Sequence, residues 1–220
     1  MTKNQKATMA HGDLMAIYEA LDRVQAIIEF NLDGTIVSAN QNFLDIFGYE
    51  LDEVVGQHHR MFCEESYASS KAYAEFWKKL GRGESDAAEF KRLGKDGKEI
   101  WLQASYNPVL DAEGNPVRVI KFATDVTKDK LQIAEYEGMV RAINRAQAVI
   151  EFEMDGTVIT ANDQFLRIFG YRLEDIVGKH HRIFCDPGYA ESQEYRRFWE
   201  KLGRGEYESD EFRRINRDGG

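Results

Sequence analysis

The chain has 220 residues, of which 43% are apolar and 12% aromatic, a composition typical of folded globular domains. Its net charge of -9 and the lack of any lysine or arginine run argue against a nucleic-acid partner, because phosphate binding needs a basic surface. No apolar stretch approaches the roughly 20 residues that span a bilayer, and the polar N-terminus has no signal-peptide core. We therefore expect a cytoplasmic protein without a membrane span.

The N-terminal part of the chain predicts a helix followed by a β-hairpin. Residues 1–22 are expected to form an N-terminal helical cap, because apolar residues recur there at helical spacing. Residues 26–32 and 35–39 are β-branched and aromatic runs, and Asp33-Gly34 between them is a typical hairpin turn.

Short helices are predicted next. Asn40 is expected to cap a helix that a glycine closes at Gly48. Residues 51–55 predict a second short helix, and residues 70–80 predict the longest one, with an apolar stripe along one side. This stripe consists of Tyr73, Phe76, Trp77 and Leu80.

Three further strands are predicted at residues 88–93, 99–108 and 117–123, each separated from the next by turn-forming residues. Alternation along the second of them places Leu102 and Tyr106 on one face. We expect these two side chains to line a largely apolar pocket.

The sequence contains a tandem duplication. Residues 23–97 align with residues 145–219 without a gap, and 42 of the 75 pairs are identical. We expect a first domain at residues 23–127, a helical linker at 128–144 and a second domain at 145–220. The second copy stops before the segment that supplies the last two strands of the first, so it is expected to lack them and to belong to a longer protein.

Three segments resemble the PAS domain family: DGTIVSANQNFLDIFGY, RLGKDGKEIWLQASYNPV and IKFATDVT. Asp125-Val126-Thr127 resembles the closing DxT motif, at which the last strand passes into a signalling helix. The chain looks most similar to PAS modules of soluble bacterial chemoreceptors, of the methyl-accepting chemotaxis and aerotaxis transducer type. The resemblance implies an α+β fold in tandem, with a five-stranded antiparallel sheet, short flanking helices, a ligand between helices and sheet, and a homodimer through flanking helices.

A histidine pair occurs in each repeat, within HHRMFC and HHRIFC. Because His58 and His59 are neighbours, we expect their rings to point in different directions and not to share one site, which disfavours zinc. The resemblance leaves His58 or His59 as an axial haem ligand, since other haem-binding PAS domains present a histidine from this region. Alternatively, one ring hydrogen-bonds backbone near Gly56 while the other lies at the surface. Cys63 is expected in the core, with a redox switch as the alternative.

The pattern Y-x-x-F-W-x-x-L-x-x-G resembles a helix of FAD-binding PAS domains in aerotaxis receptors and redox sensors. It implies that Trp77 lies beside a flavin to which Asn40 offers an amide, whereas packing without any cofactor is the alternative. Light-sensing LOV domains match less well, because His59 stands where their reactive cysteine lies. The candidate cofactor-binding residues are Asn40, His58, His59, Trp77, Leu102 and Tyr106 in the first repeat, and Asn162, His181 and Trp199 in the second.

Common catalytic and metal-binding spacings are absent from the sequence, so we expect no enzymatic activity within these residues. We predict a sensory input module for chemotaxis- or aerotaxis-type signalling that senses a small ligand, oxygen or redox state. Its expected partners are a downstream output domain or chemotaxis signalling proteins. The alternatives are a cofactor-free dimerisation scaffold and the input region of a signalling enzyme.

Overall fold

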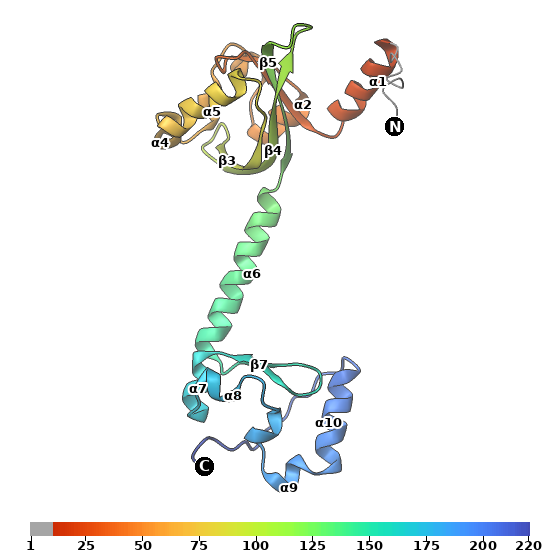
Figure 1. The fold of residues 1–220 in the computed structure, drawn as a ribbon, viewed down its shortest axis with the longest axis vertical. Coiled ribbons are helices and arrows are strands. Elements are labelled where there is room, and N and C mark those ends of the chain that lie inside the picture. The colour runs from red at the N-terminus through yellow and green to blue at the C-terminus, as the bar shows by residue number, and fades with distance from the viewer. Residues whose placement is uncertain (1–10) are drawn as a thin grey trace. The chain divides into compact units, whose positions relative to one another are not determined.

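The computed structural model describes residues 11–220, which divide into two compact units between Ile133 and Ala134 (Figure 1). The expected N-terminal cap is helix α1, His11–Asp22, and the first ten residues of that prediction lie outside the described residues. The division between the units falls within helix α6, Thr127–Ala146.

The first unit contains a five-stranded antiparallel sheet, as expected. Its strands lie in the order β2-β1-β5-β4-β3, so the last strand of the unit is at the centre beside the first. The strands are β1 (Ala26–Phe30), β2 (Ile36–Ala39), β3 (Asp86–Leu93), β4 (Glu99–Leu110) and β5 (Pro116–Asp125).

Helical segments connect β2 to β3 along the chain. The predicted cap is confirmed, because the Asn40 side chain accepts a hydrogen bond from the amide of Phe43 and Gly48 closes the helix in the left-handed region at φ 73°. The segments are α2 (Gln41–Phe47), α3 (Leu51–Val54), the 3-10 helix η1 (His59–Phe62), α4 (Glu65–Ala68) and α5 (Lys71–Gly81). Three of them, α3, η1 and α4, are four residues long, too short to produce a periodic sequence pattern.

The core of the first unit lies between these helices and one face of the sheet. Along β4, alternate residues are buried, and they include Leu102 and Tyr106. The same alternation along β5 buries Val119, Lys121 and Ala123. A lysine therefore occupies an inward-facing position in the centre of the sheet.

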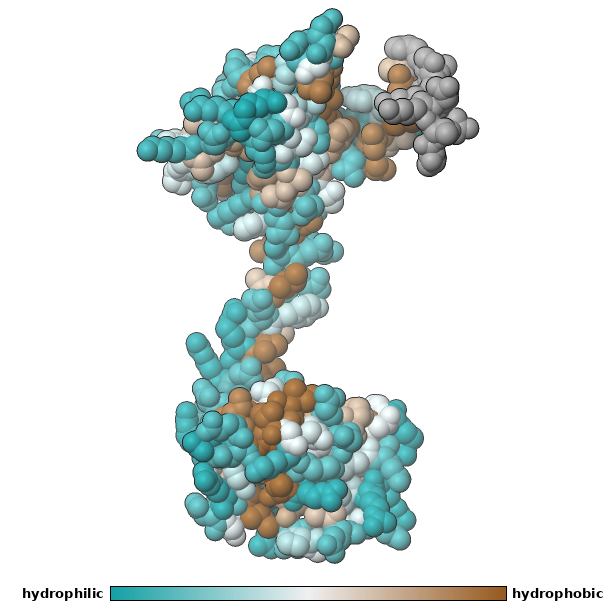
Figure 2. All heavy atoms as spheres, viewed as in Figure 1, coloured by the Kyte–Doolittle hydropathy of each residue, from teal (hydrophilic) through white to brown (hydrophobic). Residues whose placement is uncertain are grey.

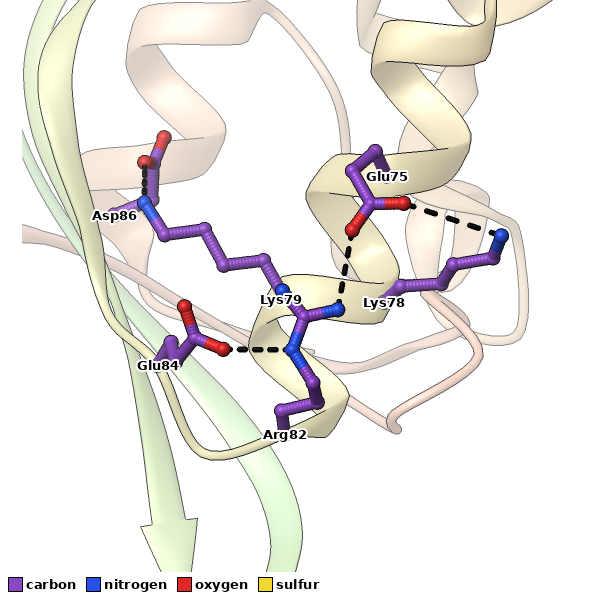
Figure 3. Close-up of polar contacts among 6 residues, drawn as sticks. All are labelled: Glu75, Lys78, Lys79, Arg82, Glu84 and Asp86. Carbon is purple, nitrogen blue, oxygen red and sulfur yellow. Dashed lines mark hydrogen bonds and ion pairs between the residues drawn. The ribbon is translucent and has the colours of Figure 1, made fainter.

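Ion pairs connect the end of α5 to the start of β3 (Figure 3). Lys79 Nζ lies 2.5 Å from Asp86 Oδ1, and Arg82 contacts Glu75 at 3.1 Å and Glu84 at 2.6 Å. Exposed pairs of this kind contribute little individually, about 0–1 kcal/mol. Together they hold the long aromatic helix in a defined position beside the sheet edge.

The last strand of the first unit passes directly into α6. The Thr127 hydroxyl accepts a hydrogen bond from the amide of Trp101 at 2.9 Å, and the amide of Val126 donates to the Trp101 carbonyl at 2.9 Å. One turn later, Lys130 pairs with Glu89 at 2.6 Å. The start of α6 is thus attached to strands β3 and β4. No helix within residues 11–220 is both long and apolar enough to cross a membrane.

The second unit repeats the first half of this fold. Its two strands form an antiparallel hairpin, followed by helices in the same order as in the first unit. The elements are β6 (Ile150–Phe152), β7 (Val158–Ala161), α7 (Asp163–Phe169), α8 (Leu173–Ile176), η2 (His181–Phe184), α9 (Pro187–Ala190) and α10 (Gln193–Gly203).

One expectation for the second unit is wrong. The repeat predicts a third strand at residues 210–215, the equivalents of 88–93, but the structure has no strand there. The chain holds no counterpart of β4 with which this segment could pair, and a strand needs a partner for its backbone hydrogen bonds. The segment instead attaches to the helices, with the amide of Ile215 donating to the Phe184 carbonyl at 2.8 Å.

Candidate functional site

A buried imidazole forms the centre of the first unit's polar core. His59, in η1, is 1% exposed. Its Nδ1 lies 3.0 Å from the hydroxyl of Tyr73 on α5, and its Nε2 lies 3.0 Å from the hydroxyl of Tyr106 on β4. The ring therefore connects the longest helix of the unit to the central part of its sheet.

Arg92 sets the direction of one bond in this network, because a guanidinium can only donate. Arg92 Nη2 lies 3.3 Å from the Tyr106 hydroxyl, so this oxygen accepts from the guanidinium. The hydrogen-bond chain runs in the order Arg92, Tyr106, His59, Tyr73 and His58.

The two neighbouring histidines contact one hydroxyl, contrary to the expectation that they would not share a site. Tyr73 OH lies 3.0 Å from His59 Nδ1 and 3.4 Å from His58 Nδ1. The reason is local: His58 caps η1, and its Nδ1 accepts the amide of Arg60 at 3.1 Å, which turns the ring back toward α5. Of the two rings, the partly exposed one bonds backbone, whereas the buried one bonds tyrosine side chains.

Burial sets the protonation of this cluster. It holds the pKa of His59 well below its usual value, and the nearby charges of Arg92 and Lys121 act in the same direction. Burial also raises the pKa of Tyr106 to about 12. At neutral pH the His59 imidazole and the two phenols of this hydrogen-bond chain are therefore neutral. Arg92, at one end of it, is permanently charged.

Trp77 is packed among rings of the protein. Its indole meets Phe30 at 5.6 Å and His59 at 5.5 Å between ring centres, in both cases edge to face. The hairpin turn closes over it, because a Cβ at Gly34 would lie 2.8 Å from His58 and 2.9 Å from Trp77. The indole N–H has no hydrogen-bond partner within the described residues.

In this arrangement His59 does not fit a haem and Trp77 does not fit a flavin. Both ring nitrogens of His59 are hydrogen-bonded, and the Trp77 indole is 9% exposed and surrounded by side chains. Haem on His59 or a flavin beside Trp77 would require the core to open. Among residues 11–220, no group of three or more His, Cys, Asp or Glu side chains could hold a metal ion.

Two further predicted residues have structural contacts of their own. Asn40 uses its amide fully: Oδ1 accepts from the amides of Ile27 and Phe43, and Nδ2 donates to the Gln25 carbonyl. It thus connects β1, α2 and the end of α1. Leu102 is fully buried in the core. Asn162 repeats the Asn40 bonds in the second unit, with Oδ1 accepting from Val149 and Phe165.

The thiol of Cys63 is buried beside the histidine. Its Sγ lies 3.8 Å from His59 Nδ1, and burial raises the pKa of the thiol. A raised pKa disfavours the reactive thiolate. These observations agree with the expectation that Cys63 is a core residue.

The second unit repeats half of the hydrogen-bond chain. His181 Nδ1 lies 3.0 Å from the Tyr195 hydroxyl, which also reaches His180 Nδ1 at 3.3 Å. Trp199 packs edge to face on His181, as Trp77 does on His59. None of residues 145–220 corresponds to Tyr106. Burial lowers the pKa of His181 to about 4, and the nearby charges of Arg214 and His180 act in the same direction.

Sequence reasoning missed two buried cations of the first unit, Arg92 and Lys121. Arg92 is 3% exposed and Lys121 is 1% exposed. Lys121 Nζ lies 4.9 Å from the centre of the Tyr106 ring and under 6 Å from the rings of Phe43 and Phe47. The alternation of β5, in which Lys121 shares a face with Val119 and Ala123, is a signal from which this lysine could have been found.

Comparison with known proteins agrees with this architecture. The chain is 43% identical over 200 residues to the biofilm dispersion protein BdlA of Pseudomonas aeruginosa, covering 91% of this chain and 48% of that protein. It is 27% identical over 165 residues to a blue-light-activated histidine kinase of Brucella canis, covering 68% of this chain and 33% of the kinase. The chain thus spans about half or less of these curated relatives.

A solved RNA-binding light-oxygen-voltage receptor superimposes with a TM-score of 0.50 at 20% identity, over 64% of this chain and 41% of that one, which supports the fold alone. The family model described as the PAS fold matches residues 36–123 and 158–220, most of both repeats. These matched segments begin at β2 and β7 and include the helices around His59 and His181. The chain belongs to the PAS fold family.

Proposed function

We propose that the chain is the sensory input region of a signalling protein of the chemotaxis or aerotaxis type, without catalytic activity of its own. One observation carries this proposal: the strand pair that holds the buried polar core also holds the start of α6. Tyr106 and Trp101 both belong to β4, and Trp101 makes two backbone hydrogen bonds to the residues that begin the helix. Sheet displacements therefore reach the helix directly.

The route from core to helix is short. Tyr106 is the register partner of Lys121, on β5, and Leu102 is the register partner of Asp125, two residues before α6. A ligand that breaks the bond between Tyr106 and His59 would free the β4 side chain and shift this strand pair. Because β5 continues into α6, the first turn of the helix would respond.

The helices that flank the units are proposed to pair in a homodimer. α6 has no buried residue, and its apolar side chains are visible on its surface in Figure 2. These apolar side chains are between 40% and 66% exposed on the two helices α1 and α6, and on each helix they lie at helical spacing. They are Leu131, Tyr136, Met139, Val140 and Ile143 on α6, and Leu14, Ile17, Tyr18 and Leu21 on α1. Burial between two copies would remove this apolar surface from water.

The relatives support a signalling role at a coarser level. One carries the name of a biofilm dispersion protein and another that of a blue-light-activated histidine kinase. In keeping with them, we propose that a downstream output domain or chemotaxis signalling proteins receive the signal in the cytoplasm. The proposed domains are residues 23–127 and 145–220, with residues 128–144 as the connecting helix.

The proposed function has three alternatives that differ in the cofactor bound: FAD, haem or none. FAD beside Trp77 and Asn40 would have Leu102 and Tyr106 lining its pocket, and haem would bind His59 or His58. FAD at Trp77 and haem on His59 require an opened core, whereas a cofactor-free scaffold requires none. The same alternatives apply to Asn162, His181 and Trp199 in the second unit. An absorption spectrum separates them, since flavin and haem absorb in the visible range and an empty core does not.

Hydrogen exchange tests the coupling on which the function rests. Tyr106→Phe removes the hydroxyl shared by His59 and Arg92, and we expect faster amide exchange in the first turns of α6, residues 127–133. Tyr49→Phe is the matched control, because Tyr49 packs on Phe62 in the same unit and is not part of the hydrogen-bond chain. Unchanged exchange at 127–133 in Tyr106→Phe would refute the proposed relay.

A further inference from the structure

Two cations are buried in the first unit without an acidic partner. Arg92 and Lys121 are almost completely inaccessible to solvent. In the described part of the chain, Arg92 donates to the Lys91 carbonyl and the Tyr106 hydroxyl, and the Lys121 nitrogen contacts aromatic rings. Removing a charge from water is costly unless a counter-charge compensates it. The folded core therefore has positive groups whose natural complement is an anion.

Both cations adjoin the same tyrosine. Lys121 Nζ lies 4.9 Å from the Tyr106 ring centre, and Arg92 Nη2 lies 3.3 Å from its hydroxyl. Each has N–H groups available for a further acceptor: the lysine nitrogen lies against aromatic rings, and Arg92 Nε has no acceptor within residues 11–220. These donors approach one region of the core from β3 and from β5.

The side chains next to this region are small. Ala104 and Ala123 are register partners on β4 and β5, each two residues from Tyr106 or Lys121 on the same face, and Ala26 is the partner of Ala123 on β1. All three alanines are buried. The inner face of the sheet thus has small side chains next to Lys121 and Tyr106.

No titratable neighbour supplies the missing negative charge. The groups facing Lys121 and Arg92 are His59 from η1, Cys63 after it, and Tyr67 and Tyr106 from α4 and β4. Burial raises the pKa of the Cys63 thiol and of both phenols, so all three are neutral at physiological pH. The imidazole is neutral as well.

We propose that the core of the first unit binds a small monocarboxylate, with its carboxylate between Lys121 and Arg92 and its apolar part over the alanine row. This inference rests on the proposed sensory function and names the chemical class of the sensed ligand. A carboxylate suits the planar fork of an arginine, and one negative charge matches surroundings that are otherwise aromatic.

Binding would couple to Tyr106 and to a proton. The carboxylate competes with the Tyr106 hydroxyl for Arg92, which would release the hydrogen-bond chain described above. Because burial lowers the pKa of Lys121, the free amine takes up a proton when it pairs with the anion. Affinity should then fall about tenfold per pH unit over the range where the free amine is neutral and the bound one is charged.

Calorimetric titration of the whole chain with butyrate tests the site. We expect one site per chain, since the second unit has Arg214 in the place of Arg92 but no counterpart of Lys121. Repeating the titration in two buffers of different ionisation enthalpy should show proton uptake. Lys121→Met should weaken binding by about tenfold or more, while Lys95→Met, an exposed lysine of the same unit, should leave it unchanged.

Several results would overturn the assignment. These are no binding of butyrate, two equal sites per chain, or the same affinity in Lys121→Met. Lys121→Leu serves as a second variant, and circular dichroism confirms that either one is folded. The signalling proposal is tested separately by amide exchange at residues 127–133. If butyrate binds at one site and this exchange does not change, the carboxylate site is supported and the relay is refuted.

Discussion

Tyr106 and Lys121 face each other across strands β4 and β5, with the lysine nitrogen 4.9 Å from the centre of the tyrosine ring. The phenol oxygen also accepts a hydrogen bond from Arg92 and is hydrogen-bonded to His59 Nε2. One tyrosine therefore connects two buried cations to the buried imidazole.

Tyr106→Phe should destabilise the first unit. The substitution keeps the ring but leaves His59 Nε2 and Arg92 each without the hydroxyl that they share, and an unsatisfied buried polar group costs about 1–3 kcal/mol. Urea denaturation followed by tryptophan fluorescence measures the loss. In Tyr49→Phe, whose ring packs on Phe62, the loss should be smaller; equal losses would show that the buried bonds add nothing.

Lys121→Met should stabilise the first unit by about 1 kcal/mol or more, because it removes a buried amine without an acidic partner and keeps an unbranched side chain. Thermal denaturation in the absence of carboxylates measures the change. Lys95→Met provides the comparison for an exposed lysine, which pairs with Glu53. A less stable Lys121→Met chain would show that the amine has a stabilising partner.

The pH dependence of stability follows from two lowered pKa values. For His59 and Lys121 the unfolded chain binds more protons than the folded one below the unfolded pKa, about 6.5 and 10.4. The free energy of unfolding therefore rises with pH across both windows, until each group is neutral in both states. We expect Lys121→Met to flatten the rise above pH 7 and to leave the rise near pH 6 in place. A parallel pH profile in the two proteins would contradict the burial of a neutral amine.

Gly34→Ala should disrupt the closure of the hairpin over His58 and Trp77. A Cβ at this position would lie within 3 Å of both rings, and φ is +87°. Gly97→Ala is the matched control, since its φ is +72° but no atom lies within 4 Å of the added Cβ. The difference between the two variants isolates the steric term, which we expect to be about 1–3 kcal/mol in denaturation experiments. If Gly34→Ala and Gly97→Ala lose similar free energies of unfolding, backbone strain accounts for both losses and the contact with His58 and Trp77 adds nothing.

Substitution on α6 should weaken the proposed dimer. Ile143→Asp places a charge on the exposed apolar face of the helix and should raise the dimer dissociation constant by about tenfold or more. Glu135→Ala, at an exposed polar position of the same helix, should have little effect. Sedimentation equilibrium distinguishes these outcomes, and a wild-type chain that is monomeric throughout would refute the pairing.

Much of the first unit could be predicted from its sequence, because local signals specify it. The Asp33-Gly34 turn, the Asn40 cap and the alternation of β4 each depend on residues close together in the chain. The fate of residues 210–215 could not be predicted in this way. Their sequence pattern is that of a strand, but strand formation depends on a distant partner that the chain lacks.

The hydrogen-bond chain could not be predicted from the sequence either, because it also depends on residues that are distant in sequence. His59, Tyr73 and Tyr106 are far apart in sequence, at separations of 14 and 47 residues from the histidine, and no spacing rule brings them together. The sequence singled out His59 and Tyr106 but assigned them to a cofactor and a pocket lining. Arg92 and Lys121 were missed because a charged residue in a strand is ordinarily expected to face solvent.

A double-mutant cycle between Tyr106→Phe and Thr127→Val tests the central claim most directly, since the first removes the core hydroxyl and the second removes the acceptor of the Trp101 amide at the start of α6. Amide exchange at residues 127–133 gives the local free energy of opening for each variant. If core and helix are coupled, the two effects are non-additive by about 0.5 kcal/mol or more. Strict additivity would contradict a relay from the buried polar core to the helix.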